Sequence, residues 1–414
     1  MNFLEKLLDG VAVEWKPLRK VVLPTSNIKW RNTDRIYRYI DLTSVSIETK
    51  KIAETTEITA NNAPSRAQKL VEKNDVIFAT TRPSQQRYCL IDNEYSGEVA
   101  STGYCVLRAK KDEVLPKWIL YCIASNDFKI YVEENQSGSA YPAISDTKVK
   151  DFIIPIPPLE IQAKIVRILD TFTDLTAELT AELTDRQKQY NYYRDRLLSF
   201  EKGEVEWKPL GEVAEKIYSG GTPKTGMAEY WVDGSIPWMS SGEVNLETVY
   251  ETEKFITEAG LKNSSAKFVP KNSLVIALAG QGKTRGKVAR LRIDLTTNQS
   301  LASLTFDESK VNSDYVYHFL KTQYENLRQI SSGGDTRGGL NLQMISNYKL
   351  PIQPLEIQAE IVRILDTFTE LTAELTAELT DRKKQYNYYR DLLLTFPKPE
   401  EVEAHLNSME KSHG

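Results

Sequence analysis

Cysteine and histidine are scarce in this 414-residue chain, which contains three of each. Cys89, Cys105 and Cys122 are an odd number and form no CxxC pair, so a disulfide framework and a thiolate metal site are disfavoured and a reducing, cytoplasmic location is expected. Two of the histidines, His405 and His413, lie in the last ten residues, which leaves little for chemistry that needs several imidazoles. No apolar run reaches the roughly 18 residues of a membrane helix, and the first residues lack the apolar core of a signal peptide.

A strong charge of one sign is also lacking, since the net charge is only −4. Residues 1–157 contain 22 Lys+Arg and 20 Asp+Glu, residues 201–353 contain 18 and 18, and residues 354–414 contain 7 and 12. Most of the negative balance therefore lies in the last segment. A nucleic-acid surface would have to be a local patch on a nearly neutral domain.

An internal repeat dominates the sequence. Residues 158–200 and 354–396 are identical at 38 of 43 positions with an offset of 196, and the hexapeptide VEWKPL occurs at 13–18 and again at 205–210. The segments between these marks are only distantly alike. A variable domain followed by a constant segment, twice over, indicates a fixed frame that carries two modules with different targets. Simple duplication of a structural unit is the alternative.

Both constant segments are expected to be long helices, because neither contains an internal Gly or Pro and each opens with Pro and an early Glu, as in Pro158 and Glu160. Each has an apolar stripe with coiled-coil spacing. The two helices would bury these stripes by pairing as an antiparallel coiled coil, the alternative being that each helix packs on its own domain. The stripe residues are Ile161, Ile165, Ile168, Phe172, Leu175, Leu179 and Leu183 in the first copy, and Ile357, Ile361, Ile364, Phe368, Leu371, Leu375 and Leu379 in the second.

This layout resembles the specificity subunit of type I restriction–modification enzymes, in the subgroup with tandem TAEL repeats in the constant helices. The resemblance covers the whole chain and rests on the alternation of variable domains and constant helices, with PLEIQ at the start of each helix. Short stretches of the second variable domain add to it, namely SGGTP at 219–223, EYW at 229–231, IPW at 236–238 and TNQ at 297–299.

The resemblance implies a mixed α/β (α+β) fold with a pseudo-twofold internal repeat. Its expected parts are a first target recognition domain (1–157), a central constant helix (158–200), a second target recognition domain (201–353), a distal constant helix (354–396) and an acidic, flexible tail (397–414).

The resemblance also implies that the chain binds double-stranded DNA and is not itself an enzyme. Each recognition domain would read one half of a split, asymmetric sequence, and the helices would dock two methyltransferase subunits. These would bring S-adenosylmethionine and flip a target adenine. Restriction and translocase subunits, with ATP and Mg, would complete the enzyme. No cofactor or metal is expected in this chain, and no membrane partner.

The stripe of each helix steps by 4, 3, 4, 3, 4 and 4 residues, a heptad pattern interrupted by a four-residue insertion. The insertion is visible as TAEL at 176–179 and again at 180–183, with the same pair at 372–379. One unit lengthens a helix by roughly 6 Å and turns it about 40° beyond a full turn. One DNA base pair advances about 3.4 Å and turns about 35°. The units are therefore expected to act as a ruler for the unread spacer.

Candidate DNA contacts lie in polar loops that occupy matched places in the two domains. Arg pairs well with guanine and Gln with adenine, so the loop at 80–87, which contains both residue types, is suited to base readout. The segment 282–292 carries five basic residues and no acid, although a hairpin with a solvated face would give the same pattern. The candidates are Arg31, Thr80, Arg82, Gln85, Arg87, Ser139 and Tyr141 in the first domain, and Thr222, Lys224, Lys283, Arg285, Lys287, Arg290, Asp335, Thr336 and Arg337 in the second.

Several other functions compete with this interpretation. The stretch ALAGQGKT at 277–284 resembles a phosphate-binding loop around Lys283, but Ala277 stands where that motif needs its first glycine. The tyrosine pairs at 192–193 and 388–389 could indicate recombinase chemistry, yet at this spacing on a helix they are more often packing residues. A free-standing bipartite DNA-binding regulator and a coiled-coil scaffold without DNA affinity complete the alternatives.

Overall fold

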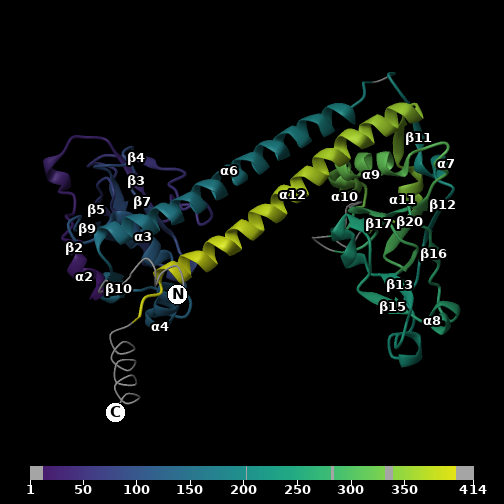
Figure 1. Ribbon diagram of the computed structural model, residues 1–414. Coiled ribbons are helices and arrows are strands. Elements are labelled where there is room, and N and C mark those ends of the chain that lie inside the picture. Colours follow the sequence, from purple (N-terminus) through teal and green to yellow (C-terminus); the bar gives the residue numbers. More distant parts are fainter. Residues whose placement is uncertain (1–12, 202, 281–283, 332–338, 398–414) are drawn as a thin grey trace, which may run out of the picture. The chain divides into compact units, whose positions relative to one another are not determined.

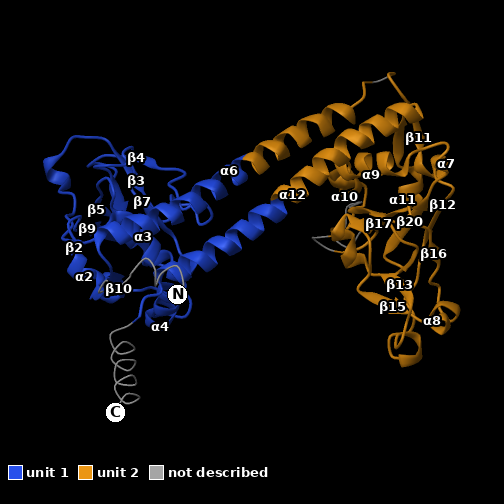
Figure 2. Ribbon diagram, in the orientation of Figure 1, with its two compact units in different colours: residues 1–181, 376–414 blue, residues 182–375 orange. Residues whose placement is uncertain are grey.

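The computed structural model describes residues 13–201, 203–280, 284–331 and 339–397 (Figure 1). The chain forms two compact units, one of residues 1–181 with 376–414 and the other of residues 182–375 (Figure 2). Two long helices, α6 (Leu159–Leu197) and α12 (Leu355–Leu394), each contribute one part to either unit. Each unit therefore combines a globular part with a pair of helix halves, and the expected mixed α/β class is confirmed.

The globular part of unit 1 contains two four-stranded sheets. The first has the order β2-β9-β6-β7, and the second has the order β4-β3-β8-β5. The central strand β6 reads Val-Ile-Phe-Ala and is buried throughout, as expected for β-branched and aromatic residues between two layers. The strands are β2 (Val22–Leu23), β3 (Tyr37–Ile40), β4 (Thr56–Ile58), β5 (Ala67–Leu70), β6 (Val76–Ala79), β7 (Tyr88–Leu90), β8 (Val99–Ser101) and β9 (Tyr104–Ala109).

Short helices cover the first sheet of unit 1 and join it to α6. Trp118 and Phe128 are completely buried in the same apolar cluster as Phe78 of β6 and Ile165 of α6. Ser125 caps the helix that contains Phe128, α4, because its hydroxyl accepts a hydrogen bond from the Phe128 N–H. The helices are α2 (Leu18–Val21), α3 (Pro116–Ala124), α4 (Asn126–Asn135) and α5 (Asp146–Asp151), with 3-10 turns η1 (Trp30–Asn32) and η2 (Pro83–Gln85).

Unit 2 repeats this plan with different residues. Its sheets have the orders β12-β20-β17-β18-β14 and β15-β13-β19-β16. The strands are β12 (Lys216–Ser219), β13 (Ile236–Met239), β14 (Thr248–Val249), β15 (Lys254–Ile256), β16 (Phe268–Val269), β17 (Leu274–Ala277), β18 (Val288–Leu291), β19 (Leu295–Thr297) and β20 (Leu301–Thr305). The shorter helices are α7 (Leu210–Val213), α8 (Glu258–Lys262), α9 (Ser313–Thr322), α10 (Tyr324–Ile330) and α11 (Leu342–Asn347), with 3-10 turns η3 (Ala228–Tyr230) and η4 (Ser241–Leu246).

The repeated hexapeptide VEWKPL forms the first strand of each globular part. In unit 1, β1 (Glu14–Pro17) pairs antiparallel with β10 (Ile153–Ile156), and Trp15 lies opposite Pro155. In unit 2, β11 (Glu206–Pro209) pairs with β21 (Lys349–Ile352), and Trp207 lies opposite Pro351. The hexapeptide thus ties the start of each domain to the strand that leads into its long helix.

The long helices pair antiparallel within each unit. In unit 1, Phe172 of α6 stacks on Tyr389 of α12 with ring centroids 5.5 Å apart. In unit 2, Tyr193 of α6 stacks on Phe368 of α12 at the same distance. From Phe172 to Tyr193 the contacts advance along α6, while their partners on α12 go back from Tyr389 to Phe368, as expected for antiparallel helices. The two contacts are equivalent under the 196-residue offset. Tyr193 and Tyr389 therefore pack between the helices, as their spacing predicted, whereas their neighbours Tyr192 and Tyr388 are 57% and 65% exposed.

The predicted stripe is buried or half-buried along nearly its whole length. No stripe residue of α6 is exposed, and one stripe residue of α12 is. The exception corrects the prediction: Ile357 is 48% exposed, whereas its counterpart Ile161 is 7% exposed. The two helix ends also differ in their apolar surroundings. Phe396 joins the buried cluster that contains Ile161, but its counterpart Phe200 is absent from the buried cluster of unit 2.

Candidate nucleic-acid interface and its support

Two loops of unit 1 that were expected to contact DNA form one continuous surface. The N–H of Arg82 donates to the carbonyl of Pro142 at 2.7 Å, and the Arg82 guanidinium lies over the Tyr141 ring, 5.4 Å from its centroid. The Ser84 hydroxyl donates to the side-chain oxygen of Gln136 at 2.9 Å. Tyr141 is 71% exposed, and Arg82 is exposed as well. A cation beside an exposed ring suits contact with phosphates and bases.

The first of these loops is held in an unusual backbone conformation. Arg82 has φ 49° and Gln86 has φ 51°, and the short η2 turn lies between them. Residues other than glycine adopt this left-handed region at a cost, so its occurrence twice in five residues points to a functional loop. Gln85 is exposed in that turn, and Ser139 is exposed in the partner loop.

The remaining candidates of unit 1 differ in how far their side chains are exposed to solvent. Thr80 is buried and its hydroxyl donates to the carbonyl of Gly103 at 2.9 Å, so the prediction that Thr80 contacts DNA is corrected. Arg87 donates to the carbonyl of Val45 at 2.6 Å and is only partly exposed. Arg31 is exposed in η1.

In unit 2, the loop between β17 and β18 borders a hollow of about 230 Å³. Lys287 lies at this hollow and donates to the side chain of Asn245 at 2.7 Å, while Arg285 is partly exposed nearby in the sequence. Thr222 is exposed, and its hydroxyl donates to Gln299 at 2.6 Å, which brings the SGGTP and TNQ stretches together. Lys224 is exposed. Lys283, Asp335, Thr336 and Arg337 lie outside the described residues, as do residues 398–414 of the predicted tail.

The strand that follows the β17–β18 loop argues against a phosphate-binding loop of the nucleotide-hydrolase type. Such a loop joins a strand to the N-terminus of a helix. Here the segment after β17 leads into β18, which returns antiparallel beside β17 with Val275 opposite Ala289. The resemblance around Lys283 therefore lacks its structural context.

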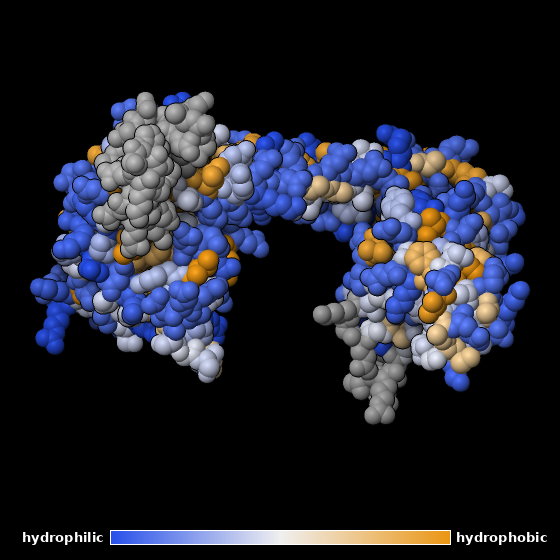
Figure 3. All heavy atoms as spheres, turned by 60° about the horizontal axis from the view of Figure 1, so that its bottom comes forward, coloured by the Kyte–Doolittle hydropathy of each residue, from blue (hydrophilic) through white to orange (hydrophobic). Residues whose placement is uncertain are grey.

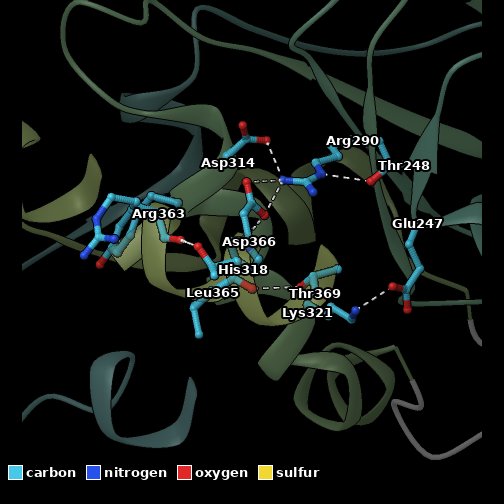
Figure 4. Close-up of polar contacts among 12 residues, drawn as sticks. Glu247, Thr248, Arg290, Asp314, His318, Lys321, Arg363, Leu365, Asp366 and Thr369 are labelled. Carbon is cyan, nitrogen blue, oxygen red and sulfur yellow. Dashed lines mark hydrogen bonds and ion pairs between the residues drawn. The ribbon is translucent and has the colours of Figure 1, made fainter. Parts of the chain in front are cut away.

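Arg290 was expected to contact DNA, but it is a buried part of the frame. Only 8% of Arg290 is exposed. Its guanidinium donates to both carboxylate oxygens of Asp366 at 2.8 and 3.1 Å, and its Nε donates to the Thr248 hydroxyl at 2.9 Å (Figure 4). Asp314 completes the pairing at 3.3 Å. The expectation was wrong because Arg290 lies in β18, in which every residue is buried.

His318 of α9 shares Asp366 with Arg290. The His318 Nε2 lies 2.9 Å from Asp366 Oδ1, and its Nδ1 makes no hydrogen bond within the part of the chain that the structure describes. Burial lowers the pKa of His318 below its usual 6.5, against the opposing influence of Asp366, and the cations of Arg290 and Lys321 lower it further. His318 is therefore neutral near pH 7 and donates through Nε2.

We expect unit 2 to lose stability as the pH falls below 6.5. Below this pH, His318 is protonated more readily in the unfolded chain than in the folded one. The free energy of unfolding therefore falls, by at most about 1.4 kcal/mol per pH unit, until the pH passes the lowered pKa of the folded state. Hydrogen exchange of α9 amides, corrected for intrinsic rates, should therefore quicken from pH 7 to pH 5. The control is α3, where Tyr121 binds the corresponding carboxylate. Equal pH dependence in α3 and α9, or its persistence in His318→Gln, would contradict the assignment.

The described residues contain no exposed thiol and no cluster suited to a metal ion. All three cysteines are buried and free, and burial raises the pKa of the Cys89 and Cys105 thiols to about 12. Among these residues there is no group of three or more His, Cys, Asp or Glu that could hold a metal ion. None of the helices within the described ranges is long and apolar enough to cross a membrane. Hydrophilic side chains cover most of the described surface in Figure 3, with apolar ones in small groups.

The type I restriction modification DNA specificity domain matches the chain twice, at residues 22–186 and 202–382. Each match ends within a long helix, so the two matches follow the internal repeat. The chain belongs to this family.

Three similar proteins align with this chain along nearly their whole length. The specificity subunit of the type I restriction enzyme EcoR124I/EcoR124II from Escherichia coli is 36% identical over 415 residues, which cover 97% of this chain and 99% of that subunit. Among solved structures, the type I restriction–modification S subunit from M. genitalium matches with a TM-score of 0.62 at 14% identity, over 94% of this chain and 98% of that one. A chain from a study of complex assembly and conformational transition of the type I system matches with a TM-score of 0.57 at 22% identity, over 92% and 97%. These structures share the fold.

One aspartate in each long helix, which binds polar side chains of the adjoining globular part, was not predicted from the sequence. Asp366 binds Arg290 and His318 in unit 2. Its counterpart Asp170 accepts a hydrogen bond from Tyr121 at 2.6 Å and pairs with Lys117 at 2.7 Å in unit 1. The available signal was that this aspartate is identical in both copies although it lies off the apolar stripe.

Proposed function

We propose that this chain is the DNA-recognition subunit of a type I restriction–modification enzyme. Each globular part reads one half of a split, asymmetric DNA sequence, and the paired helices set the spacer between the halves. The helices also dock two methyltransferase subunits, which bring S-adenosylmethionine, and restriction subunits add ATP- and Mg-dependent cleavage. The chain itself is not an enzyme and acts in the cytoplasm on double-stranded DNA.

The observation that carries this proposal is the contrast between frame and domains. Two nearly identical helices make equivalent contacts, as in Phe172 with Tyr389 and Phe368 with Tyr193, yet they hold domains with different loops. A frame that stays constant while its loops differ is suited to reading two different sequences from one scaffold. Family membership favours this reading over a free-standing DNA-binding regulator.

A binding experiment separates these two possibilities. We expect the chain with two methyltransferase subunits to bind a duplex that carries both half-sites far more tightly than the chain alone, because the partners supply phosphate contacts. Fluorescence anisotropy at fixed salt measures both affinities. Equally tight binding by the chain alone would favour the regulator and contradict the proposal.

Arg82→Ala should weaken DNA binding by the assembled complex by about 1–3 kcal/mol if Arg82 reads a base. Arg285→Ala is the corresponding test in unit 2. In each case the loss should be larger for the cognate sequence than for a random duplex, as measured by competition binding. Lys111→Ala, which removes an exposed cation at a turn, is the control. If Arg82→Ala binds all sequences with unchanged affinity, this loop is not part of the DNA interface.

A further inference from the structure

Each long helix holds its domain through a buried glutamine, the last residue of PLEIQ. Gln162 and Gln358 are both fully buried. The Gln162 side-chain oxygen accepts from the N–H of Leu115 at 2.9 Å, and its amide donates to the carbonyl of Pro157 at 2.8 Å. In unit 2, Gln358 accepts from the N–H of Asn312 at 2.9 Å and donates to the carbonyl of Gln353 at 2.7 Å.

These glutamines bind the same point in both domains. Leu115 is the N-cap residue of α3, and Asn312 is the N-cap residue of α9. The residue that binds the helix aspartate has the same sequence spacing from the N-cap in both domains. Tyr121 comes six residues after Leu115, and His318 comes six residues after Asn312. Two domains that are only distantly alike therefore place one short helix identically on the same pair of side chains.

The short helix in turn supports the strand that closes the candidate reading loop. In unit 1, α3 packs against β7, which follows the loop that contains Arg82. In unit 2, α9 packs against β18, which follows the loop between β17 and β18. Unit 2 has an added link, because Arg290 of β18 bonds directly to Asp366. A continuous path of contacts thus runs from each constant helix to one loop.

We infer that Gln162 with Asp170, and Gln358 with Asp366, form two equivalent sockets that orient the recognition domains on the frame. They are positioning residues: they touch no DNA, but they fix the direction in which the supported loop meets its half-site. Because the socket uses a backbone N–H at the N-cap and one or two polar side chains near it, domains with different reading loops can occupy it. The inference rests on the proposed function.

The sockets predict that a substitution on one helix affects one half-site only. Asp366→Asn keeps the shape of the side chain but loses an acceptor for Arg290 or His318. In the assembled complex with methyltransferase subunits, we expect discrimination against single base-pair changes to fall about tenfold in one half-site, the size of one lost base contact. Discrimination in the other half-site should be unchanged. Asp170→Asn should have the same effect on the opposite half-site.

The measurement is the initial rate of DNA methylation on the cognate duplex and on duplexes with one altered base pair. Asp174→Asn makes the same charge change at an exposed position four residues along α6 and should match the wild type. If an aspartate variant does not assemble, Tyr121→Phe and Arg290→Lys are the milder pair, because each removes only part of the contact to one aspartate.

Three outcomes would overturn the sockets: both aspartate variants affecting the same half-site, each variant affecting both half-sites equally, or a rate that falls with discrimination intact in both half-sites. A wild-type complex that methylates no specific sequence would instead contradict the proposed function. The two failures are therefore distinguishable.

Discussion

Deletion of residues 180–183, one TAEL unit, is expected to shorten the unread spacer by one or two base pairs and to leave both half-site sequences unchanged. The deletion shortens α6 by roughly 6 Å and unwinds it by about 40° beyond a full turn. A base pair accounts for about 3.4 Å and about 35° of DNA. The rotation thus matches one base pair, and the length matches one or two.

The helix should survive this deletion because the remaining sequence improves its heptad pattern. Without residues 180–183, the positions from Ile161 to Leu197 step by 4 and 3 residues in strict alternation, with Arg186 as the one polar residue among them. An added TAEL unit should lengthen the spacer correspondingly. Mapping of methylated sites for the wild type, the deletion and the insertion measures the effect, with Glu178→Gln as a variant of unchanged length. Altered half-sites with an unchanged spacer would contradict the ruler.

Replacing residues 19–157 by a second copy of residues 211–353 is expected to convert the recognised sequence from asymmetric to palindromic. The replaced segment lies between the same marks in both halves, VEWKPL before it and PLEIQ after it. Gln162 and Asp170 remain in α6, and the copied domain brings Asn312 and His318 to meet them. An antiparallel frame presents equivalent helix starts in opposite directions, so two identical domains should read the same half-site on opposite strands.

Methylation mapping tests the copied domain as well. The retained half-site of the wild type should appear twice as an inverted repeat, and the other should vanish. The matched control copies residues 19–157 into the second position, which should yield a palindrome of the other half-site. A chimera that still methylates the original asymmetric sequence would show that half-site choice lies outside the exchanged segments.

The frame could be predicted from the sequence because its signals are local and repeated. The stripe and the absence of internal Gly and Pro predicted helices at 158–200 and 354–396, and the structure has them at Leu159–Leu197 and Leu355–Leu394. Pairing followed from the need to bury two apolar stripes, and the antiparallel direction followed from the compact domain that connects the two helices in one chain. The exposure of Ile357 could not be foreseen, because the two copies of the stripe are identical at this position and only tertiary packing distinguishes them.

The sequence proposed a DNA interface as loops rather than as individual side chains, and that interface stays a prediction. The contact of Arg82 with Tyr141 joins residues far apart in the sequence, and no periodic pattern announces it. Arg290 and Thr80 were misassigned for a related reason: a cation or hydroxyl in a polar stretch looks available until tertiary structure supplies a buried partner. The socket residues carried one usable signal, which was identity in both helix copies at polar positions off the stripe.

Genome-wide mapping of methylated adenine tests the central claim most directly, in cells that express this chain with its methyltransferase partner and no other adenine methyltransferase. We expect one bipartite, asymmetric sequence, in which two short half-sites are separated by a fixed number of unspecified base pairs and methylated on both strands. The modification should disappear when either protein is omitted. Methylation at a continuous sequence, or the same sites without this chain, would contradict the account.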